Sequence, residues 1–167
     1  MKKELLTGIA MLGLLAGCAS KQASVDDQKK GDDQINEVVK NEEKVYDAID
    51  EFNKFSAENP IYFAFDSDKV NKKDILNNYK VYFEKLKELK QVKLTINGYC
   101  DSRGSVEYNM NLGKRRASSV KNAIKNNVKN DVKMKLISFG KNKFKKYTDD
   151  VEENYRKNRR VEIIASK

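Results

Sequence analysis

Residues 98–120 read GYCDSRGSVEYNMNLGKRRASSV. They connect a segment whose apolar residues alternate with polar ones to a segment whose apolar residues recur every three or four positions. Just before this stretch, Leu94 and Ile96 alternate with polar residues, which is typical of a half-buried β-strand. Within and beyond its second half, apolar residues recur every three or four positions, at Ala117, Val120, Ile124 and Val128. That spacing predicts an amphipathic helix. We therefore expect a loop over residues 98–105 that carries the chain from a strand into a helix.

The neighbouring elements follow from the same two periods. The run Ile61–Phe65 is continuously apolar and aromatic, as expected of a strand buried on both faces. Residues 75–89 have helical spacing, and two further strands are predicted over Met134–Phe139 and Val161–Ala165. This order predicts an α+β domain, strand-helix-strand-helix-strand-strand, with two helices on one face of a four-stranded mixed sheet. We expect Gly140–Asn158 to be a long connection that is functional or mobile.

The composition of the 167-residue chain narrows its function. It holds 34 Lys and Arg, 25 Asp and Glu, a net charge of +9 and no His. Without His, the chain cannot form Ser-His-Asp or Cys-His catalytic groups or a His-ligated zinc site. Carboxylate pairs, Lys and an internal Cys remain able to catalyse, but we expect a protein that is not an enzyme. We also expect no cofactor and no metal.

The first 18 residues have the pattern of an export signal. Lys2 and Lys3 precede an apolar run over residues 5–16, which is too short to span a hydrocarbon core of about 30 Å. The tetrapeptide Leu15-Ala16-Gly17-Cys18 resembles a bacterial lipobox. We expect residues 1–17 to be a lipoprotein signal peptide and Cys18 to be acylated, which attaches a protein to a membrane without a transmembrane helix. The alternative is an ordinary signal peptide that leaves Cys18 as a free thiol.

Residues 18–57 are predicted to be a lipidated tether, followed by a folded domain over residues 58–167. Up to residue 33 the tether is almost without apolar residues, so it cannot bury enough surface to fold. From residue 34 a helical period appears, with Phe52 and Phe55 near its end. This amphipathic helix either docks on the domain or self-associates.

The net charge changes sign along the chain, from −5 over residues 18–60 to +13 over residues 61–167. A basic domain suggests an acidic polymer or an anionic surface as its neighbour, although a coding bias towards Lys would give the same excess. Arginine is more informative, because all six Arg lie between residues 103 and 160 while the other 28 basic residues are Lys. A guanidinium group offers a carboxylate a planar fork that an ammonium group lacks. These Arg residues therefore bind a carboxylate ligand or form structural ion pairs.

Three blocks of sequence together resemble the OmpA-like peptidoglycan-binding domain family. They are Ile61–Asp68, the stretch 98–120 quoted above, and Asn158–Val161. With the lipobox at Cys18, the whole chain is similar to lipidated members of this family. The resemblance implies an OmpA-like domain that binds the peptide stem of peptidoglycan without covalent chemistry.

The resemblance also implies a binding site. In the family motif, an Asp after the second strand faces the ammonium group of meso-diaminopimelate, and an Arg fifteen residues later pairs with its carboxylate. These positions are Asp101 and Arg116 in this chain. We expect both groups to lack a partner until the ligand binds. The pocket wall would be formed by four further residues, Phe65, Asp66, Leu112 and Ala117.

One departure from the family pattern lies beside this site. Tyr99 and Cys100 stand where the family often has His-Thr, so the pocket edge is bulkier and carries a thiol. We expect Cys100 to be a small buried hydrophobe.

The resemblance implies a location and partners. A lipid on Cys18, followed by Ala19 rather than Asp, implies the outer membrane, with the domain in the periplasm. The expected partners are peptidoglycan, the outer membrane through the lipid anchor, and the Tol system with its TolB subunit, which acts in envelope constriction during division. Nucleic acid is not expected.

Three alternatives stay open. The first is an OmpA-like envelope-stabilising lipoprotein that is not linked to Tol. The second is an enzyme that uses Asp66, Asp68 and Asp101 on cell-wall glycan. The third is nonspecific binding of anionic polymers by the basic domain.

Overall fold

The structure is a computed structural model that describes residues 40, 44–89, 91–128 and 132–167. All of them fall within one unit of the chain, Val38–Lys167. The predicted signal peptide over residues 1–17, the lipidation site Cys18 and the first part of the tether lie outside the described residues. Within the described ranges, no helix is both long and apolar enough to cross a membrane.

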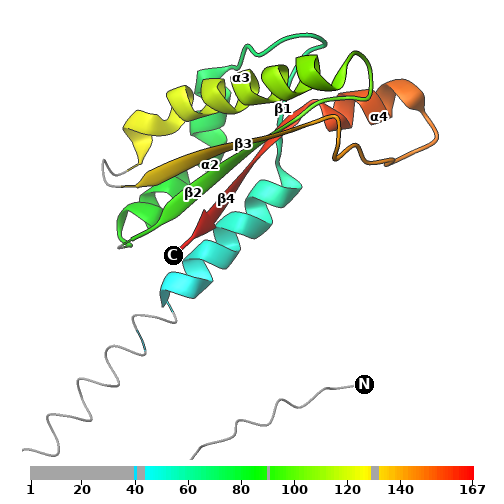
Figure 1. Ribbon diagram of the computed structural model, residues 1–167. Helices are drawn as coiled ribbons and strands as arrows, with labels where there is room; N and C mark the ends of the chain where they lie inside the picture. The colour runs from blue at the N-terminus through cyan, green and yellow to red at the C-terminus, as the bar shows by residue number, and fades with distance from the viewer. Residues whose placement is uncertain (1–39, 41–43, 90, 129–131) are drawn as a thin grey trace, which may run out of the picture. The chain divides into compact units, whose positions relative to one another are not determined.

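Four strands form a mixed sheet (Figure 1). In sheet order they are β1 (Ile61–Tyr62), β4 (Arg160–Ser166), β2 (Lys93–Tyr99) and β3 (Lys133–Gly140). β2 pairs with β3 in parallel and with β4 antiparallel, and β1 pairs antiparallel with β4. The parallel pair needs a crossover connection, which the helix between β2 and β3 provides. The predicted four-stranded mixed sheet is confirmed.

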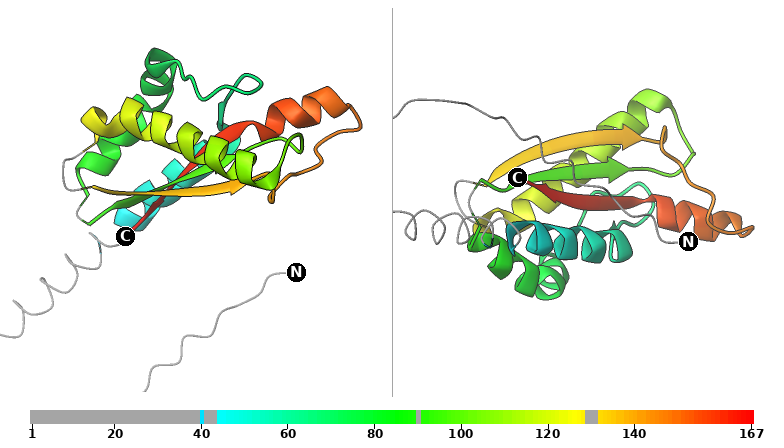
Figure 2. Two further views of the ribbon diagram at one scale, coloured as in Figure 1. Left: turned by 45° about the horizontal axis from the view of Figure 1, so that its top comes forward. Right: turned by 90° about the horizontal axis from the view of Figure 1, so that it is seen from below.

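Two capped helices cover one face of the sheet (Figure 2). The backbone of α2 (Lys72–Lys87) begins after Asn71, and that of α3 (Val106–Ile124) begins after Ser105; both residues accept hydrogen bonds from the first turn. The apolar stripes of both helices and the inward residues of β2 and β4 form a single hydrophobic core. Its main members are Ile75, Tyr79, Phe83, Leu86, Leu94, Ile96, Val120, Ile124, Ile163 and Ala165. The predicted packing of two helices on one face of the sheet is confirmed.

The first strand is shorter than the sequence predicts. A strand buried on both faces was expected over Ile61–Phe65, whereas β1 ends at Tyr62 and that side chain is exposed. The reason is position: β1 lies at the edge of the sheet and pairs only with β4. Of these five residues only Phe63 is buried, and Phe65 is 62% exposed.

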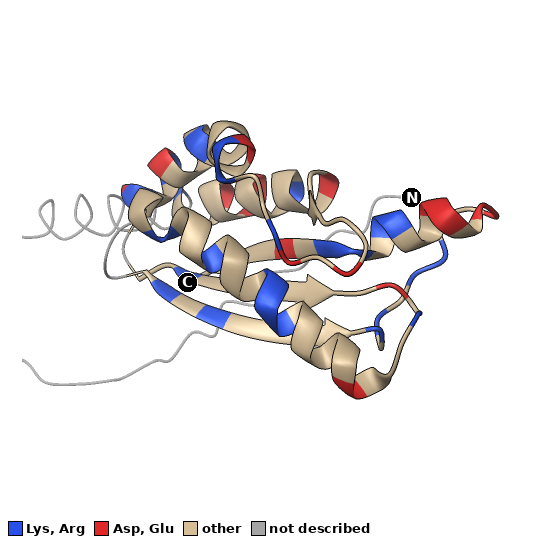
Figure 3. Cartoon of the chain, turned by 90° about the horizontal axis from the view of Figure 1, so that it is seen from above, with Lys and Arg blue, Asp and Glu red and all other residues tan. Residues whose placement is uncertain are grey.

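The expected long connection Gly140–Asn158 contains a helix, α4 (Val151–Asn158). Asp150 caps its start, and charge complements its dipole, because Glu152 and Glu153 lie in the first turn and basic residues in the last (Figure 3). Periodicity could not reveal α4, because its buried residues are polar, Asn154 and Asn158.

These two asparagines hold the rest of the connection in place. The side-chain oxygen of Asn154 accepts hydrogen bonds from the backbone N–H groups of Tyr147 and Thr148, at 2.6 and 3.1 Å. Asn158 accepts from the N–H of Lys145 at 2.8 Å and donates to its carbonyl oxygen at 2.7 Å. Residues 145–148, which precede α4, are therefore hydrogen-bonded to that helix.

A helix over residues 44–58, which we call the leader helix, docks on the domain beside β4 (Figures 1 and 2). Ile49 and Phe52 are buried in the common core. Docking is one of the two alternatives that the sequence left open. The unit that contains the sheet thus also includes this helix, which the sequence places in the tether.

The leader helix also covers an open strand edge. β4 pairs with β1 only at residues 160 and 161, so its remaining backbone groups on that side need other partners. The Asn53 amide donates to the carbonyl oxygen of Ala165 at 3.0 Å and accepts from its N–H at 2.8 Å. Ser56 accepts from the N–H of Ile163 at 3.1 Å. Two side chains of the helix therefore take the place of a neighbouring strand.

Replacing Asn53 with Ala should lower the free energy of unfolding by about 1–3 kcal/mol, because two hydrogen bonds to Ala165 are lost together. Urea denaturation of Asn53→Ala measures the loss, with Lys54→Ala on the exposed side of the same helix as control. Equal midpoints for the two variants would show that the helix does not stabilise the edge of β4.

Candidate functional site

A pocket of about 170 Å³ opens where the end of β2, the loop after β1 and α3 meet. Its lining comes from these elements and from the loop between β2 and α3: Phe65, Asp66, Cys100, Asp101, Arg103, Gly104, Tyr108, Asn109, Leu112 and Arg116. The fold thus brings together five of the residues that the sequence assigns to the pocket.

Ala117 is a correction to that assignment. It does not line the pocket but is fully buried in the hydrophobic core. The reason is the helical period, which places Ala117 on the same stripe as Val120 and Ile124, turned towards the sheet. Its neighbour Arg116 reaches the pocket instead.

Two glycines let α3 approach β2 closely beside the pocket. A Cβ atom on Gly98 would lie 2.0 Å from the carbonyl oxygen of Gly113. A Cβ atom on Gly113 would lie 2.4 Å from Oγ of Ser138. This contact between backbones brings Arg116, one turn further along α3, to the end of β2.

Arg116 is the most buried charged group of the pocket: its exposed fraction rounds to 0%, and it still borders the cavity as a lining residue. Its Nε donates to the carbonyl oxygen of Ser67 at 2.8 Å, and its Nη2 donates to that of Ala64 at 3.2 Å. Nη1 donates to the carbonyl oxygen of Tyr99 at 3.0 Å and to Sγ of Cys100 at 3.5 Å. Burial lowers the pKa of this guanidinium group. The expectation that Arg116 lacks partners is therefore wrong, because four of its five N–H groups already have acceptors.

The loop after β1 is bent around Arg116. The carbonyl groups of Ala64 and Ser67 both meet its guanidinium group, and Asp66 between them has a φ of 52°, in the left-handed region. Such a conformation is costly for a residue other than Gly and is kept only where the surroundings require it. The Tyr108 hydroxyl of α3 donates a hydrogen bond to the Asp66 carboxylate. The loop is therefore tied to α3 by Arg116 and Tyr108, and also by an ion pair between Asp68 and Arg115.

Asp101 is buried, and both its oxygens are engaged. Oδ1 accepts from the backbone N and the Nε of Arg103, at 3.2 and 3.3 Å. Oδ2 accepts from Nη2 of Arg103 at 2.7 Å and from Nη1 of Arg159 at 3.4 Å. Burial disfavours the carboxylate form, but these hydrogen bonds outweigh it and lower the pKa of Asp101. The expectation that Asp101 stays without a partner is thus also wrong.

Arg103 sits between two aromatic rings. Its Cζ lies 4.2 Å from the ring centroid of Phe65 and 4.3 Å from that of Tyr155 on α4. A second carboxylate, Glu152, lies 3.8 Å from its Nη1. Stacking and ion pairing together place this guanidinium group beside Asp101, while 34% of its side chain remains exposed.

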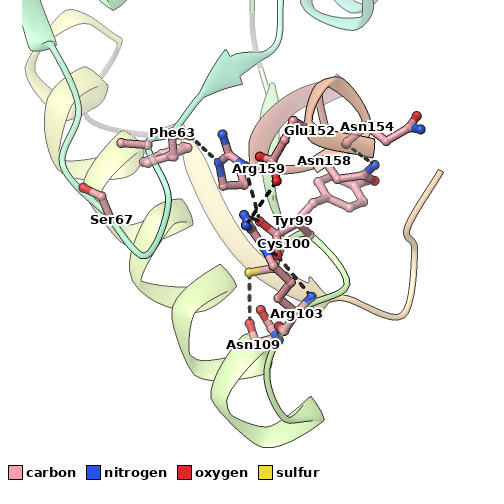
Figure 4. A network of polar contacts seen from close by, with 12 residues as sticks. Phe63, Ser67, Tyr99, Cys100, Arg103, Asn109, Glu152, Asn154, Asn158 and Arg159 are labelled. Carbon is pink, nitrogen blue, oxygen red and sulfur yellow. Dashed lines mark hydrogen bonds and ion pairs between the residues drawn. The ribbon is translucent and has the colours of Figure 1, made fainter. Parts of the chain in front are cut away.

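Figure 4 shows the network of polar contacts around the end of β2. Arg159 enters it through a 3.0 Å hydrogen bond from its Nε to the carbonyl oxygen of Phe63. On the near side of α3, the thiol of Cys100 donates to the carbonyl oxygen of Asn109 at 3.3 Å. Cys100 is buried, as predicted, and burial raises the pKa of its thiol. The Asn109 amide in turn donates to the carbonyl oxygen of Arg103 at 2.6 Å, which shapes the loop between β2 and α3.

The neighbouring residues Arg159 and Arg160 serve opposite faces of the sheet. Arg159 reaches Asp101 in the pocket, whereas Nε of Arg160 donates to Oε1 of Glu162 at 2.8 Å and its Cζ lies 4.0 Å from the ring centroid of Tyr99. Alternation at the start of β4 explains the difference. The sequence could not separate a ligand-binding role from a structural one for this pair. In the structure, Arg160 is a buried structural ion-pair partner and Arg159 belongs to the site.

Four lining residues were not assigned to the pocket by sequence reasoning: Arg103, Gly104, Tyr108 and Asn109. A signal for Arg103 existed, since it is the first of the six Arg and lies two residues after Asp101 in a loop with Ser and Gly. Among the described residues, no group of three or more acidic or Cys side chains could hold a metal ion.

Comparison with known proteins finds a matching family model and a set of relatives. The model of the OmpA family matches residues 62–159. Peptidoglycan-associated lipoproteins of Buchnera aphidicola subsp. Baizongia pistaciae and Legionella pneumophila are each 35% identical, over 113 and 107 residues. Each alignment covers 64% of this chain and 60% of the relative, so the match spans less than two thirds of these relatives.

Solved structures with the same fold include two from other bacteria. The peptidoglycan-associated lipoprotein from Burkholderia pseudomallei has a TM-score of 0.57 and 32% identity, and the match covers 66% of this chain and 92% of that one. The C-terminal domain of Helicobacter pylori MotB has a TM-score of 0.55 and 25% identity, with 65% and 84% covered.

Removing the charge of Asp101 should destabilise the domain in a pH-dependent way. Its pKa is lowered on folding, so the stability that it contributes is present above its unfolded pKa, about 3.9, and is lost as the pH falls through the lower folded value. At pH 7, Asp101→Asn should cost about 1.5–3 kcal/mol, the usual range for a hydrogen bond to a charged group. Urea denaturation between pH 7 and pH 2.5 should show the difference between wild type and variant shrinking with acidity. A difference that stays constant would contradict this account of the ion pair.

Proposed function

This chain belongs to the OmpA family, and from that premise we propose that it is an outer-membrane lipoprotein whose domain binds peptidoglycan without covalent chemistry. The name of its relatives, peptidoglycan-associated lipoprotein, supports the proposal. The observation that carries it is the pocket, in which a carboxylate, Asp101, and guanidinium groups line one small cavity. Opposite charges in one small cavity suit a ligand that is itself a zwitterion.

The proposed ligand is the free end of meso-diaminopimelate in the peptidoglycan stem, which carries an ammonium group and a carboxylate on one carbon. Asp101 receives the ammonium group. Arg116, which lines the pocket and has one N–H group beyond its four hydrogen bonds, receives the carboxylate through that single donor. Phe65, Asp66 and Leu112 form the wall. A cavity of about 170 Å³ suits the end of an amino-acid side chain rather than a disaccharide.

Catalysis on the glycan is less well supported than binding. A general acid on a glycan needs a carboxyl group with a raised pKa, whereas the pKa of Asp101 is lowered. The other two candidate carboxylates are also engaged: Asp66 accepts from Tyr108, and Asp68 pairs with Arg115 at 3.2 Å. We therefore propose that the protein is not an enzyme. Release of soluble muropeptides from sacculi by the purified protein would overturn this part of the proposal.

We propose that the chain is a tether made of three parts. Residues 1–17 are removed as a signal peptide, and residues 18–57 are a tether that begins at acylated Cys18 and ends in the leader helix docked on the domain. Residues 58–167 bind the wall. In this arrangement, the protein acts with the Tol system, including TolB, in envelope constriction. Normal constriction and an intact outer membrane after deletion of the gene would instead place it among OmpA-like proteins that act outside that system.

Asp101→Asn should reduce cosedimentation of the purified protein with peptidoglycan sacculi by at least about tenfold in affinity, since it removes the charge that holds the ligand's ammonium group. Arg116→Lys should do the same, because an ammonium group cannot hold the carbonyl groups of Ala64 and Ser67 together. Asp149→Asn is the matched control, because that carboxylate is 97% exposed and does not line the pocket.

Moderate salt distinguishes this proposal from nonspecific attraction to an anionic polymer. Binding that disappears steeply with salt and is equal in all four proteins would mean that the basic surface, and not the pocket, holds peptidoglycan.

Cys18→Ser should abolish acylation and move the protein from the membrane fraction to the soluble periplasmic or cytoplasmic fraction. Cell fractionation followed by immunoblotting measures the change. Recovery of the variant with the outer membrane in wild-type amounts would contradict the lipid anchor.

A further inference from the structure

We propose that Arg103 sets the ligand selectivity of the pocket, by requiring that a ligand bring a carboxylate together with its ammonium group. The inference rests on the proposed function, because it concerns how the same pocket discriminates among ligands that carry an ammonium group. Its basis is the contact of Arg103 with Asp101. The sequence had led us to expect Asp101 to have no partner.

Arg103 occupies the place that an ammonium ligand needs. It contacts both oxygens of Asp101, with Nε 3.3 Å from Oδ1 and Nη2 2.7 Å from Oδ2. A cationic ligand cannot approach Asp101 closely without displacing this fork or sharing the carboxylate with it. A cation of the protein itself thus occupies the Asp101 carboxylate.

The surroundings of Arg103 leave it able to move. Arg116 is fully buried and bonded to the backbone of the loop after β1 and of the end of β2, whereas Arg103 stacks on Phe65 and Tyr155 and is 34% exposed. A cation–π contact persists at any distance up to about 6 Å from the ring centroid, so the two rings hold the guanidinium group less strictly than hydrogen bonds to the backbone would. Arg103 is therefore the movable cation of the pocket, and Arg116 is the fixed one.

The charges that a ligand carries decide whether it can displace Arg103 from Asp101. The guanidinium groups of Arg103 and Arg159 both contact the carboxylate of Asp101. Arg116 adds a further positive charge to the pocket lining, and Asp66 a second carboxylate. A plain amine that takes Asp101 leaves Arg103 without its main carboxylate partner and adds a further positive charge. A ligand that carries a carboxylate beside the ammonium group gives Arg103 a new partner in exchange, at no net change of charge.

The test compares two competitors for sacculi binding by the full-length protein. meso-Diaminopimelate carries both ammonium groups and both carboxylates, and 1,5-diaminopentane is the same carbon chain without the carboxylates. For the wild type, diaminopimelate should compete at concentrations at least about tenfold lower, the difference expected for one charge-assisted hydrogen bond. In Arg103→Gln that ratio should fall, mainly because 1,5-diaminopentane competes better once Asp101 is released, while the carboxylate contact with Arg116 keeps the ratio above one.

Two further variants separate the effect of the positive charge of Arg103 from that of its planar shape and from that of an unrelated Arg→Gln change. Arg103→Lys retains the charge but not the planar fork, and it should give an intermediate ratio. Arg156→Gln makes the matched change on α4, where the side chain pairs with Glu153 and does not line the pocket, and it should keep the wild-type ratio.

Each outcome bears on one claim. An unchanged ratio in Arg103→Gln, or complete loss of sacculi binding by that variant, would overturn the proposed role of Arg103, since the first shows no discrimination and the second an essential contact. A wild-type protein that does not sediment with sacculi at all would overturn the proposed function instead.

Discussion

The pocket depends on one buried interaction, the hydrogen bonding of Arg116 to the backbone. Burying a guanidinium group without a carboxylate is expensive, and the structure offsets that cost with three carbonyl groups, the Cys100 thiol and the ring of Phe63 at 5.1 Å. The carbonyl groups belong to the loop after β1 and to the end of β2, while Arg116 itself belongs to α3. One side chain thus fixes the three segments that form the pocket, and the close contact of Gly98 with Gly113 places it there.

Around Arg116, the other two arginines of the site differ in how firmly they are held. Arg159 is mostly buried and bonded to the carbonyl oxygen of Phe63, so it is anchored like Arg116. Arg103 is stacked and about one third exposed to solvent, and it pairs with the carboxylate that the proposed ligand needs. A site with a rigid frame and one exchangeable counter-ion avoids an uncompensated buried carboxylate in the absence of ligand. In such a site, the proposed ligand replaces Arg103 as the partner of Asp101 rather than pairing with a carboxylate that had no partner.

Much of this architecture could be predicted from the sequence, because it depends on local periodicity. The alternation around Leu94 and Ile96 and the stripe through Val120 and Ile124 gave the central strand and the covering helix, and the motif blocks brought Asp101 and Arg116 to one pocket. What could not be predicted depends on tertiary partners. Nothing local indicates that Arg116 would bond to carbonyl groups of distant segments, or that Phe65 and Tyr155 would stack on Arg103 beside Asp101.

The other departures have the same origin. Helix α4 buries amides rather than apolar side chains, so its period is invisible to a hydrophobicity pattern. Ala117 was assigned to the pocket by analogy with the motif, but its helical stripe turns it into the core. The left-handed conformation of Asp66 arises from two carbonyl groups converging on one guanidinium group, a constraint that no short segment contains.

The most direct test of a fixed frame with one movable cation is an NMR titration that follows the Nε–H signals of the arginine side chains while meso-diaminopimelate is added. The Arg103 signal should shift the most, because its Nε leaves Asp101 for the ligand, whereas the Arg116 signal should stay close to its starting position, because its Nε remains bonded to Ser67. A large shift of Arg116 with an unmoved Arg103 signal would contradict the account.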